Sequence, residues 1–174
     1  MNYRIKEIEK EDIYDYYRIH VYSWKETYNE IISSDLLDKN IYELDQIVEK
    51  QKNKFEQIKR EEPDYKRFIL YINDEPVGIF AICKSREEKY NNSGELGCLY
   101  LLKKAQKKGY GKIMFESAKE ELKKLGFKDM IIYCLKDNPT TKFYEYEGGK
   151  LMYSIKKNIG KQNLIENIYY YEKI

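Results

Sequence analysis

The segment Lys103–Lys112 has the residue types that hold an anion. It contains five lysines and no acidic residue within ten positions, and it also contains Gly109 and Gly111. Glycines let the backbone approach a ligand closely, and free N–H groups at a helix start point toward negative charge. The segment follows an apolar run, Glu95–Leu102, and precedes a helical pattern that ends at Gly126. We therefore expect a phosphate-binding turn between a strand and a helix.

Two residues exclude the common nucleotide-binding motifs. A P-loop needs a glycine where Gln106 stands and a serine or threonine where Ile113 stands. A dinucleotide fingerprint needs a leading Gly-x-Gly, and Gln106 breaks that pattern as well. The turn is therefore predicted to hold a different small anionic ligand.

A strand, the turn, a helix and a second strand form one predicted unit. Apolar residues recur at spacings of three and four from Phe115 to Leu125, which predicts a helix face. Gly126 suits the left-handed residue that often ends a helix. The continuous apolar run Met130–Leu135 indicates a strand buried on both faces, as in a parallel pairing. We therefore expect a βαβ unit.

The remaining segments are predicted to extend this unit into a single domain of residues 1–174. A chain of 174 residues that is 42% hydrophobic can bury one core. Alternation predicts further strands at 3–8, 68–72, 77–83, 151–155 and 165–171, with a turn at 158–160 joining the last two. Helical spacing predicts helices between Asp12 and Tyr28, from Ser33, from Ile41 to Ile58, and after Asn138-Pro139.

Composition limits the function classes. A net charge of +2 does not indicate wholesale binding to nucleic acid. No apolar run reaches membrane-spanning length and no signal peptide is evident, so we expect a soluble, cytoplasmic protein. Cys83, Cys98 and Cys134 are odd in number and widely spaced, which indicates reduced thiols. Those scattered cysteines and one histidine, His20, predict no metal site.

His20 lies on the apolar face of the first predicted helix. Two interpretations stay open. The residue is either an imidazole of the core or of a groove wall, or it is a general base.

Several motifs together resemble the GCN5-related N-acetyltransferase (GNAT) family. The pattern Gln106-x-x-Gly109-x-Gly111 is similar to the family's pyrophosphate site for acetyl-CoA. The other matching segments, in chain order, are Trp24–Ile32, Pro76–Ala81 with Gly78, Glu95–Leu101, and Asn138–Gly149 with its Phe143-Tyr144-Glu145. The resemblance covers nearly the whole chain.

The resemblance implies both the fold and the co-substrate. The fold would be α/β (α+β), with a mixed, mostly antiparallel twisted central sheet of about seven strands and flanking helices. Acetyl-CoA would lie where the fourth and fifth strands splay apart, and no metal would be needed. The implied cofactor-binding residues are Leu99, Tyr100, Leu101, Gln106, Lys107, Lys108, Gly109, Tyr110, Gly111, Lys112 and Asn138. Asn138 is equally suited to a plain helix cap.

The implied chemistry is direct acetyl transfer to a primary amine. Glu95 matches the family's general base, and strand alternation predicts that it shares a face with Gly97, Leu99 and Leu101. It would act directly or through water, or it is an ordinary carboxylate at a strand end. Tyr144 matches the general acid that protonates the leaving thiolate; the alternative is a core aromatic residue.

The residues that would bind the acceptor show the weakest sequence pattern of the implied site. We expect it to enter over Tyr22, Trp24, Tyr28 and the loop 86–92, with Trp24 and Tyr28 binding a small cationic amine such as a polyamine. A protein lysine or N-terminus is the alternative acceptor, and a non-catalytic acyl-CoA sensor is the alternative function. The sequence leaves open the acyl-chain preference and the oligomeric state, a homodimer included.

Overall fold

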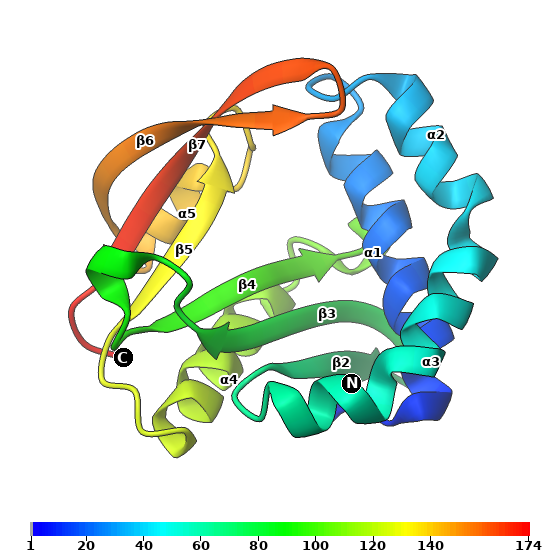
Figure 1. Cartoon of the computed structure of the whole chain (residues 1–174), viewed down its shortest axis with the longest axis horizontal. Helices are drawn as coiled ribbons and strands as arrows, with labels where there is room; N and C mark the ends of the chain where they lie inside the picture. The colour runs from blue at the N-terminus through cyan, green and yellow to red at the C-terminus, as the bar shows by residue number, and fades with distance from the viewer. Residues whose placement is uncertain (1) are drawn as a thin grey trace.

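Seven strands pair into one sheet in the order β1-β2-β3-β4-β5-β7-β6 in the computed structural model, which describes residues 2–174 (Figure 1). Only the β4–β5 pair is parallel; all other neighbours are antiparallel. The strands are β1 Tyr3–Glu7, β2 Lys66–Ile72, β3 Glu75–Lys84, β4 Gly94–Leu101, β5 Met130–Leu135, β6 Lys150–Ile159 and β7 Gln162–Tyr171. This mixed, mostly antiparallel sheet confirms the predicted fold class.

Helices cover both faces of the sheet (Figure 1). They are α1 Ile13–Tyr28, α2 Ser34–Tyr42, α3 Leu44–Glu61, α4 Tyr110–Lys124 and α5 Thr141–Tyr146, with short 3-10 turns at Lys10–Asp12, Glu88–Tyr90 and Lys103–Ala105. The apolar faces of α1 and α3 form one core cluster with one side of β2 and β3. The apolar faces of α4 and α5 form a second cluster on the other side. No helix within residues 2–174 is both long enough and apolar enough to cross a membrane.

Two glycines fix how α4 lies against the sheet. A Cβ added at Gly78 of β3 would lie 2.8 Å from the Sδ of Met114, so the missing side chain lets α4 pack closely on the strand. At the other end of α4, Gly126 has a φ of +93°, and the Phe127 N–H donates to the Leu122 carbonyl at 3.1 Å. This dihedral angle and this hydrogen bond confirm the predicted left-handed helix end.

A β-bulge in the middle of β4 changes which side chains share a face. Cys98 pairs with Ala81 of β3, whereas Leu96 pairs with Ile82, so one residue of β4, Gly97, is left over. Leu96, Leu99 and Leu101 consequently all face the α4 side, although strict alternation would separate Leu96 from the other two. Glu95, which precedes Leu96, therefore lies on the α1 side. The prediction that it shares a face with Leu99 and Leu101 is wrong because of this bulge.

The two parallel strands separate directly after the bulge. β4 and β5 pair only at Gly94–Met130, Glu95–Ile131 and Leu96–Ile132. From Gly97 onward the β5 side of β4 has no partner strand, and Figure 1 shows β5 turning steeply away from β4. Residues 97–100 are accordingly exposed or half-buried, although they belong to the central strand of the sheet.

The C-terminal hairpin closes the far side of this opening. β6 and β7 each have ten residues, so both strands are longer than the predicted 151–155 and 165–171. The chain turns at residues 160–161, so the predicted turn at 158–160 begins two residues too early. The hairpin tip reaches the connection between α1 and α2, where the Ser33 N–H donates to Gln162 Oε1 at 2.7 Å and Gln162 Nε2 donates to the Ile31 carbonyl at 3.1 Å (Figure 1).

Candidate active site

A cavity of about 340 Å³ fills the opening between β4 and β5. We call it the seam cavity. Its walls come from β4 (96–101), the turn before α4 (Gln106, Lys107, Gly111), β5 (132–134), the segment 138–144, and the end of α1 (Thr27, Tyr28). Buried backbone groups normally find a partner. The unpaired edge of β4 therefore offers its N–H and C=O groups to an extended ligand.

The turn before α4 has the geometry of an anion site. Gln106 Nε2 donates to the Leu101 carbonyl at 2.8 Å, which ties the turn to the end of β4. Lys107 (φ +59°) and Gly109 (φ +86°) are both left-handed. Within residues 2–174, the N–H groups of residues 107–109 and of Gly111 donate to no protein acceptor. Successive free N–H groups at the start of a helix attract phosphate.

Three predicted residues meet at the other wall of the seam cavity. Asn138 Nδ2 donates to the Tyr28 hydroxyl at 2.8 Å, while Asn138 Oδ1 accepts from the Thr140 N–H at 2.9 Å. The asparagine thus positions the segment before α5 and keeps one N–H for a ligand. Tyr144 lines the same cavity, and its hydroxyl makes no hydrogen bond to another residue within 2–174. Burial raises the pKa of Tyr144 well above its usual value, so the phenol keeps its proton.

Glu95 is buried and held by one residue. Its carboxylate is 1% exposed, Arg86 Nη2 lies 2.6 Å from Glu95 Oε1, and the Arg86 N–H donates to Glu95 Oε2 at 3.3 Å. The Arg86 side chain is itself 78% exposed and comes from the loop between β3 and β4. The hydrogen bond to Glu95 raises the pKa of Arg86, so this guanidinium stays charged.

A second cavity, of about 510 Å³, lies on the α1 side of the sheet. We call it the α1 cavity. Most of its lining consists of aromatic, acidic, basic and sulfur-containing side chains. The lining residues are Tyr16, Tyr17, His20, Glu61, Glu62, Pro63, Asp64, Tyr65, Ala81, Cys83, Lys84, Arg86, Gly97 and Cys98. Gly97 and Cys98 line both cavities. The two cavities therefore meet at the bulge of β4.

The imidazole and the two thiols of the α1 cavity are uncharged near pH 7. Burial lowers the pKa of His20 to about 4, so the imidazole carries no charge. Burial raises the pKa of Cys83 to about 12 and that of Cys98 to about 11, so both thiols keep their protons. The Cys98 Sγ lies 3.4 Å from the Tyr16 hydroxyl. Neither cysteine has the lowered pKa that a nucleophilic thiol needs.

The structure brings most of the predicted cofactor residues together. Leu99, Tyr100, Leu101, Gln106, Lys107, Gly111 and Asn138 line the seam cavity. Lys108 instead donates to the Lys104 carbonyl at 2.9 Å, Lys112 pairs with Glu147 at 3.4 Å, and the Tyr110 side chain packs in the core. Gly109 contributes backbone at the start of α4.

The predicted acceptor residues are divided between the seam cavity, the α1 cavity and the protein surface. Tyr28 lines the seam cavity. Trp24 stands between His20 and Tyr28 in a row of rings on α1, with centroids 5.6 and 5.4 Å away, and lines neither cavity. Tyr22 is exposed. Of the predicted entrance, only Arg86 lines the α1 cavity.

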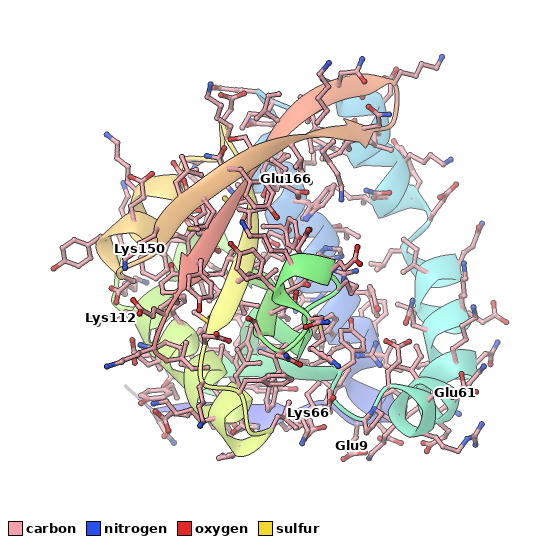
Figure 2. The ribbon with its side chains drawn as sticks, turned by 60° about the vertical axis from the view of Figure 1, so that its left-hand side comes forward. Glu9, Glu61, Lys66, Lys112, Lys150 and Glu166 are labelled. Carbon is pink, nitrogen blue, oxygen red and sulfur yellow. The ribbon has the colours of Figure 1, made fainter. Side chains whose placement is uncertain are left out.

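The sequence reasoning missed most of the α1 cavity. Tyr16 and Tyr17 belong to the predicted helix, and the helical repeat of aromatic residues there is the only feature of the sequence that could have pointed to this cavity. Glu61, Glu62 and Asp64 lie at the end of α3 and in the connection to β2, where nothing in the local sequence suggests a site (Figure 2, Glu61). No group of three or more His, Cys, Asp or Glu side chains within residues 2–174 could hold a metal ion.

Known proteins share both the sequence pattern and the fold. The model of the Acetyltransferase (GNAT) family matches residues 18–148. Uncharacterized N-acetyltransferase YuaI of Bacillus subtilis (strain 168) is 29% identical over 144 residues, which are 81% of this chain and 76% of that protein. The crystal structure of PaiA N-acetyltransferase from Thermoplasma acidophilum, in complex with coenzyme A, superposes with a TM-score of 0.72 at 22% identity and covers 95% of this chain and 98% of that one. Ribosomal-protein-alanine N-acetyltransferase from Brucella melitensis superposes with a TM-score of 0.72 at 15% identity, covering 97% and 98% of the two chains.

Proposed function

The chain belongs to the GNAT family and is an acetyl-CoA-dependent N-acetyltransferase, and from this premise we propose that its acceptor is the primary amine of a small cationic molecule such as a polyamine. The observation that carries the proposal is the meeting of two cavities at Gly97 and Cys98. One cavity has the features of a coenzyme A site. The other has carboxylates and tyrosine rings, which suit a cation.

The seam cavity fits the donor. The free N–H groups of residues 107–109 and Gly111 would hold the pyrophosphate, as the dipole at the start of α4 favours negative charge. The unpaired edge of β4 from Leu99 to Leu101 would bond the amides of the pantetheine arm, with the remaining N–H of Asn138 on the opposite wall. An N–H near Leu101 would polarise the thioester carbonyl. Acetyl-CoA supplies the acetyl group as a thioester.

Two side chains would carry out the proton transfers, one as the general base and one as the general acid. The acceptor arrives as an ammonium ion and must lose a proton before its nitrogen can attack. Glu95 would accept that proton directly or through a water molecule. The nitrogen then forms the C–N bond, the C–S bond breaks, and Tyr144 would donate its proton to the departing sulfur. The phenol regains a proton from the acetylated nitrogen by way of solvent, so the net products are an amide, a thiol and one proton.

The walls of the α1 cavity support a cationic acceptor. Glu61, Glu62 and Asp64 contribute three carboxylates against the one lysine of the lining, Lys84, and the charge of Arg86 is balanced by Glu95. Tyr16, Tyr17 and Tyr65 add ring surface. Figure 2 shows Glu61 on the opposite side of the view from Lys112 at the start of α4, so the basic turn and the acidic end of α3 are separated. A protein N-terminus is the second candidate acceptor, since a similar fold is described as a ribosomal-protein-alanine N-acetyltransferase.

An acceptor panel tests the proposal. The thiol released from acetyl-CoA would be followed with diamines, triamines, lysine peptides and peptides with a free N-terminus. We expect diamines or triamines to give the highest kcat/KM. A preference for peptides would overturn the small-molecule acceptor and support the second candidate. Calorimetry should show acetyl-CoA binding near micromolar affinity, and no binding at millimolar concentration would contradict the assignment of the seam cavity.

Two further expectations accompany the proposal. Residues 1–174 are proposed to form a single domain, because one sheet takes strands from Tyr3 to Tyr171. A cytoplasmic location stays a prediction, supported by three cysteines that form no disulfide.

A further inference from the structure

The ion pair between Arg86 and Glu95 closes the route that an acceptor amine must take. Glu95 is reached from the α1 side because the bulge turns it away from Leu99 and Leu101. Arg86 lines the α1 cavity, and its Nη2 lies 2.6 Å from Glu95 Oε1. Within residues 2–174 no residue other than Arg86 donates a hydrogen bond to this carboxylate. The guanidinium therefore stands between the cavity and the carboxylate.

Arg86 is weakly held apart from this one contact. Its side chain is 78% exposed, whereas the carboxylate that it bonds is 1% exposed. The other titratable groups that face Glu95 are the Cys83 thiol on the neighbouring strand and the Tyr133 hydroxyl, which donates to Glu87 Oε2 at 2.7 Å. Neither group is a cation. Displacing Arg86 thus exposes little apolar surface, but it leaves a buried carboxylate that needs another cation.

A protonated primary amine can take the place of the guanidinium. Both groups carry one positive charge and several N–H donors. They differ in one respect that matters for the reaction, because an ammonium loses a proton to a nearby base far more readily than a guanidinium does. Gly97, which has no side chain, lies where the α1 cavity opens into the seam cavity. An amine at Glu95 would therefore lie at the entrance to the donor site.

We propose that Arg86 is a placeholder for the acceptor, a positioning residue whose guanidinium neutralises Glu95 in the free enzyme and is exchanged for the substrate ammonium on binding. The inference rests on the proposed function. If Arg86 competes with the acceptor in this way, the ion pair must break before the acceptor binds. The acceptor therefore binds more weakly, by the free energy needed to break the ion pair. Removing the guanidinium should tighten acceptor binding, whereas removing a conventional binding residue would weaken it.

Arg86→Gln tests the exchange, with Lys89→Gln as the matched control. Lys89 lies on the same loop and also carries a positive charge, but it faces the rings of Tyr90 and Tyr153 and lines neither cavity. We expect Arg86→Gln to lower the KM for 1,4-diaminobutane at pH 8.5 by about three- to tenfold, with the KM for acetyl-CoA unchanged. Lys89→Gln should change either constant less than about twofold. An unchanged or higher KM for the diamine in Arg86→Gln would overturn the exchange.

A second measurement covers the case in which Arg86→Gln is too unstable to assay. Methylguanidinium should inhibit the wild-type enzyme competitively against the diamine and without effect on acetyl-CoA binding. It should inhibit Arg86→Gln more strongly if that variant folds. Inhibition that is non-competitive with the diamine would contradict the proposal. If the wild-type enzyme acetylates no amine at all, the proposed function fails; if it acetylates diamines but neither result appears, only the role of Arg86 fails.

Discussion

The seam cavity and the α1 cavity share two residues of β4, yet their walls are assembled in different ways. The seam cavity is built mainly from three short stretches, 96–101, 106–111 and 132–144, that follow one another through the βαβ unit and the segment directly after it. The α1 cavity combines one continuous stretch, 61–65, with residues of α1, β3, the following loop and β4 that lie far apart in the sequence. The contacts proposed for the donor in the first cavity come mainly from backbone groups, whereas those proposed for the acceptor in the second come from side chains.

This difference has a functional consequence. A backbone site is fixed by the fold and tolerates exchange of most side chains, so it suits a donor common to a whole family. A side-chain site can change residue by residue without disturbing the sheet, so it suits an acceptor that differs between relatives. We therefore expect substitutions in the seam cavity to affect every acceptor alike. Substitutions in the α1 cavity should discriminate between acceptors.

The largest effect is expected from a negative charge at the start of α4. A Cβ at Gly111 would meet no other atom within 4 Å, so Gly111→Asp should fold, and an acid in the first turn of a helix is favourable. A carboxylate ~5 Å from a phosphate costs about 3 kcal/mol at an effective dielectric constant of about 20. Calorimetry should therefore show coenzyme A binding weakened by about 100-fold or more.

Gly111→Ala is the control for the loss of the glycine itself. It should weaken coenzyme A binding by less than about fivefold, because the added methyl group meets open space. Near wild-type binding by Gly111→Asp would show that the anion site lies elsewhere and would remove the main distinction between the two cavities.

The next largest effect should come from Tyr144. Tyr144→Phe removes the only side-chain proton donor proposed for the sulfur, and general acid catalysis typically contributes ~10²-fold or more. We expect kcat to fall at least about tenfold, with coenzyme A affinity within about twofold of wild type. Steady-state kinetics with calorimetry of the same preparation would measure both.

Tyr171→Phe is the matched control for Tyr144→Phe. The Tyr171 hydroxyl donates to the Tyr144 carbonyl at 2.7 Å, a structural bond whose loss costs about 1 kcal/mol of folding stability. It should lower the melting temperature and leave kcat nearly unchanged. Equal losses of kcat in the two variants would assign Tyr144 a packing role instead of a catalytic one.

The contrast between the cavities also explains what the sequence could predict. The turn from Gln106 to Gly111 is contiguous, so its spacing alone indicated an anion site. Gly126 likewise predicted the end of α4 from the local sequence alone. Asp64 gave no such signal, because it reaches the α1 cavity only through the packing of α3 against α1.

Two errors have a common physical origin. The face of Glu95 was predicted from strict alternation, and a one-residue bulge at Gly97 reverses it. The strands β6 and β7 were predicted too short because the outer half of this hairpin is polar and mostly exposed, as at Lys156 and Lys157, and so lacks the apolar alternation that marks a half-buried strand. Both features depend on pairing between strands, which a single segment does not encode.

A smaller effect is expected from Asp64 in the α1 cavity. Asp64 is half-buried and forms no ion pair within residues 2–174, so its charge is available to an acceptor. Asp64→Asn should raise the KM for a diamine about three- to tenfold, equivalent to about 1 kcal/mol, and leave coenzyme A affinity unchanged. Glu49→Gln, on α3 but outside both cavities, should change neither constant. A similar rise in KM for Glu49→Gln would indicate a general charge effect, with no contribution specific to the cavity.

The smallest effect on activity is expected from His20. The rings of Tyr17, Trp24 and Tyr100 surround the imidazole, and burial lowers its pKa to about 4, so it is neutral throughout pH 6–8. His20→Gln should therefore change kcat/KM less than about twofold over that range, provided that no proton passes through this residue. A larger, pH-dependent loss would support the interpretation of His20 as the general base.

The pH dependence of folding stability should change in the same variant. A histidine in the unfolded chain binds a proton below pH about 6.5, whereas the buried His20 does not. The free energy of unfolding should therefore fall by up to about 1.4 kcal/mol per pH unit as the pH is lowered from about 6.5 to 4. Denaturant titrations at several pH values should show a shallower loss in His20→Gln, because the neutral glutamine removes this difference in proton binding.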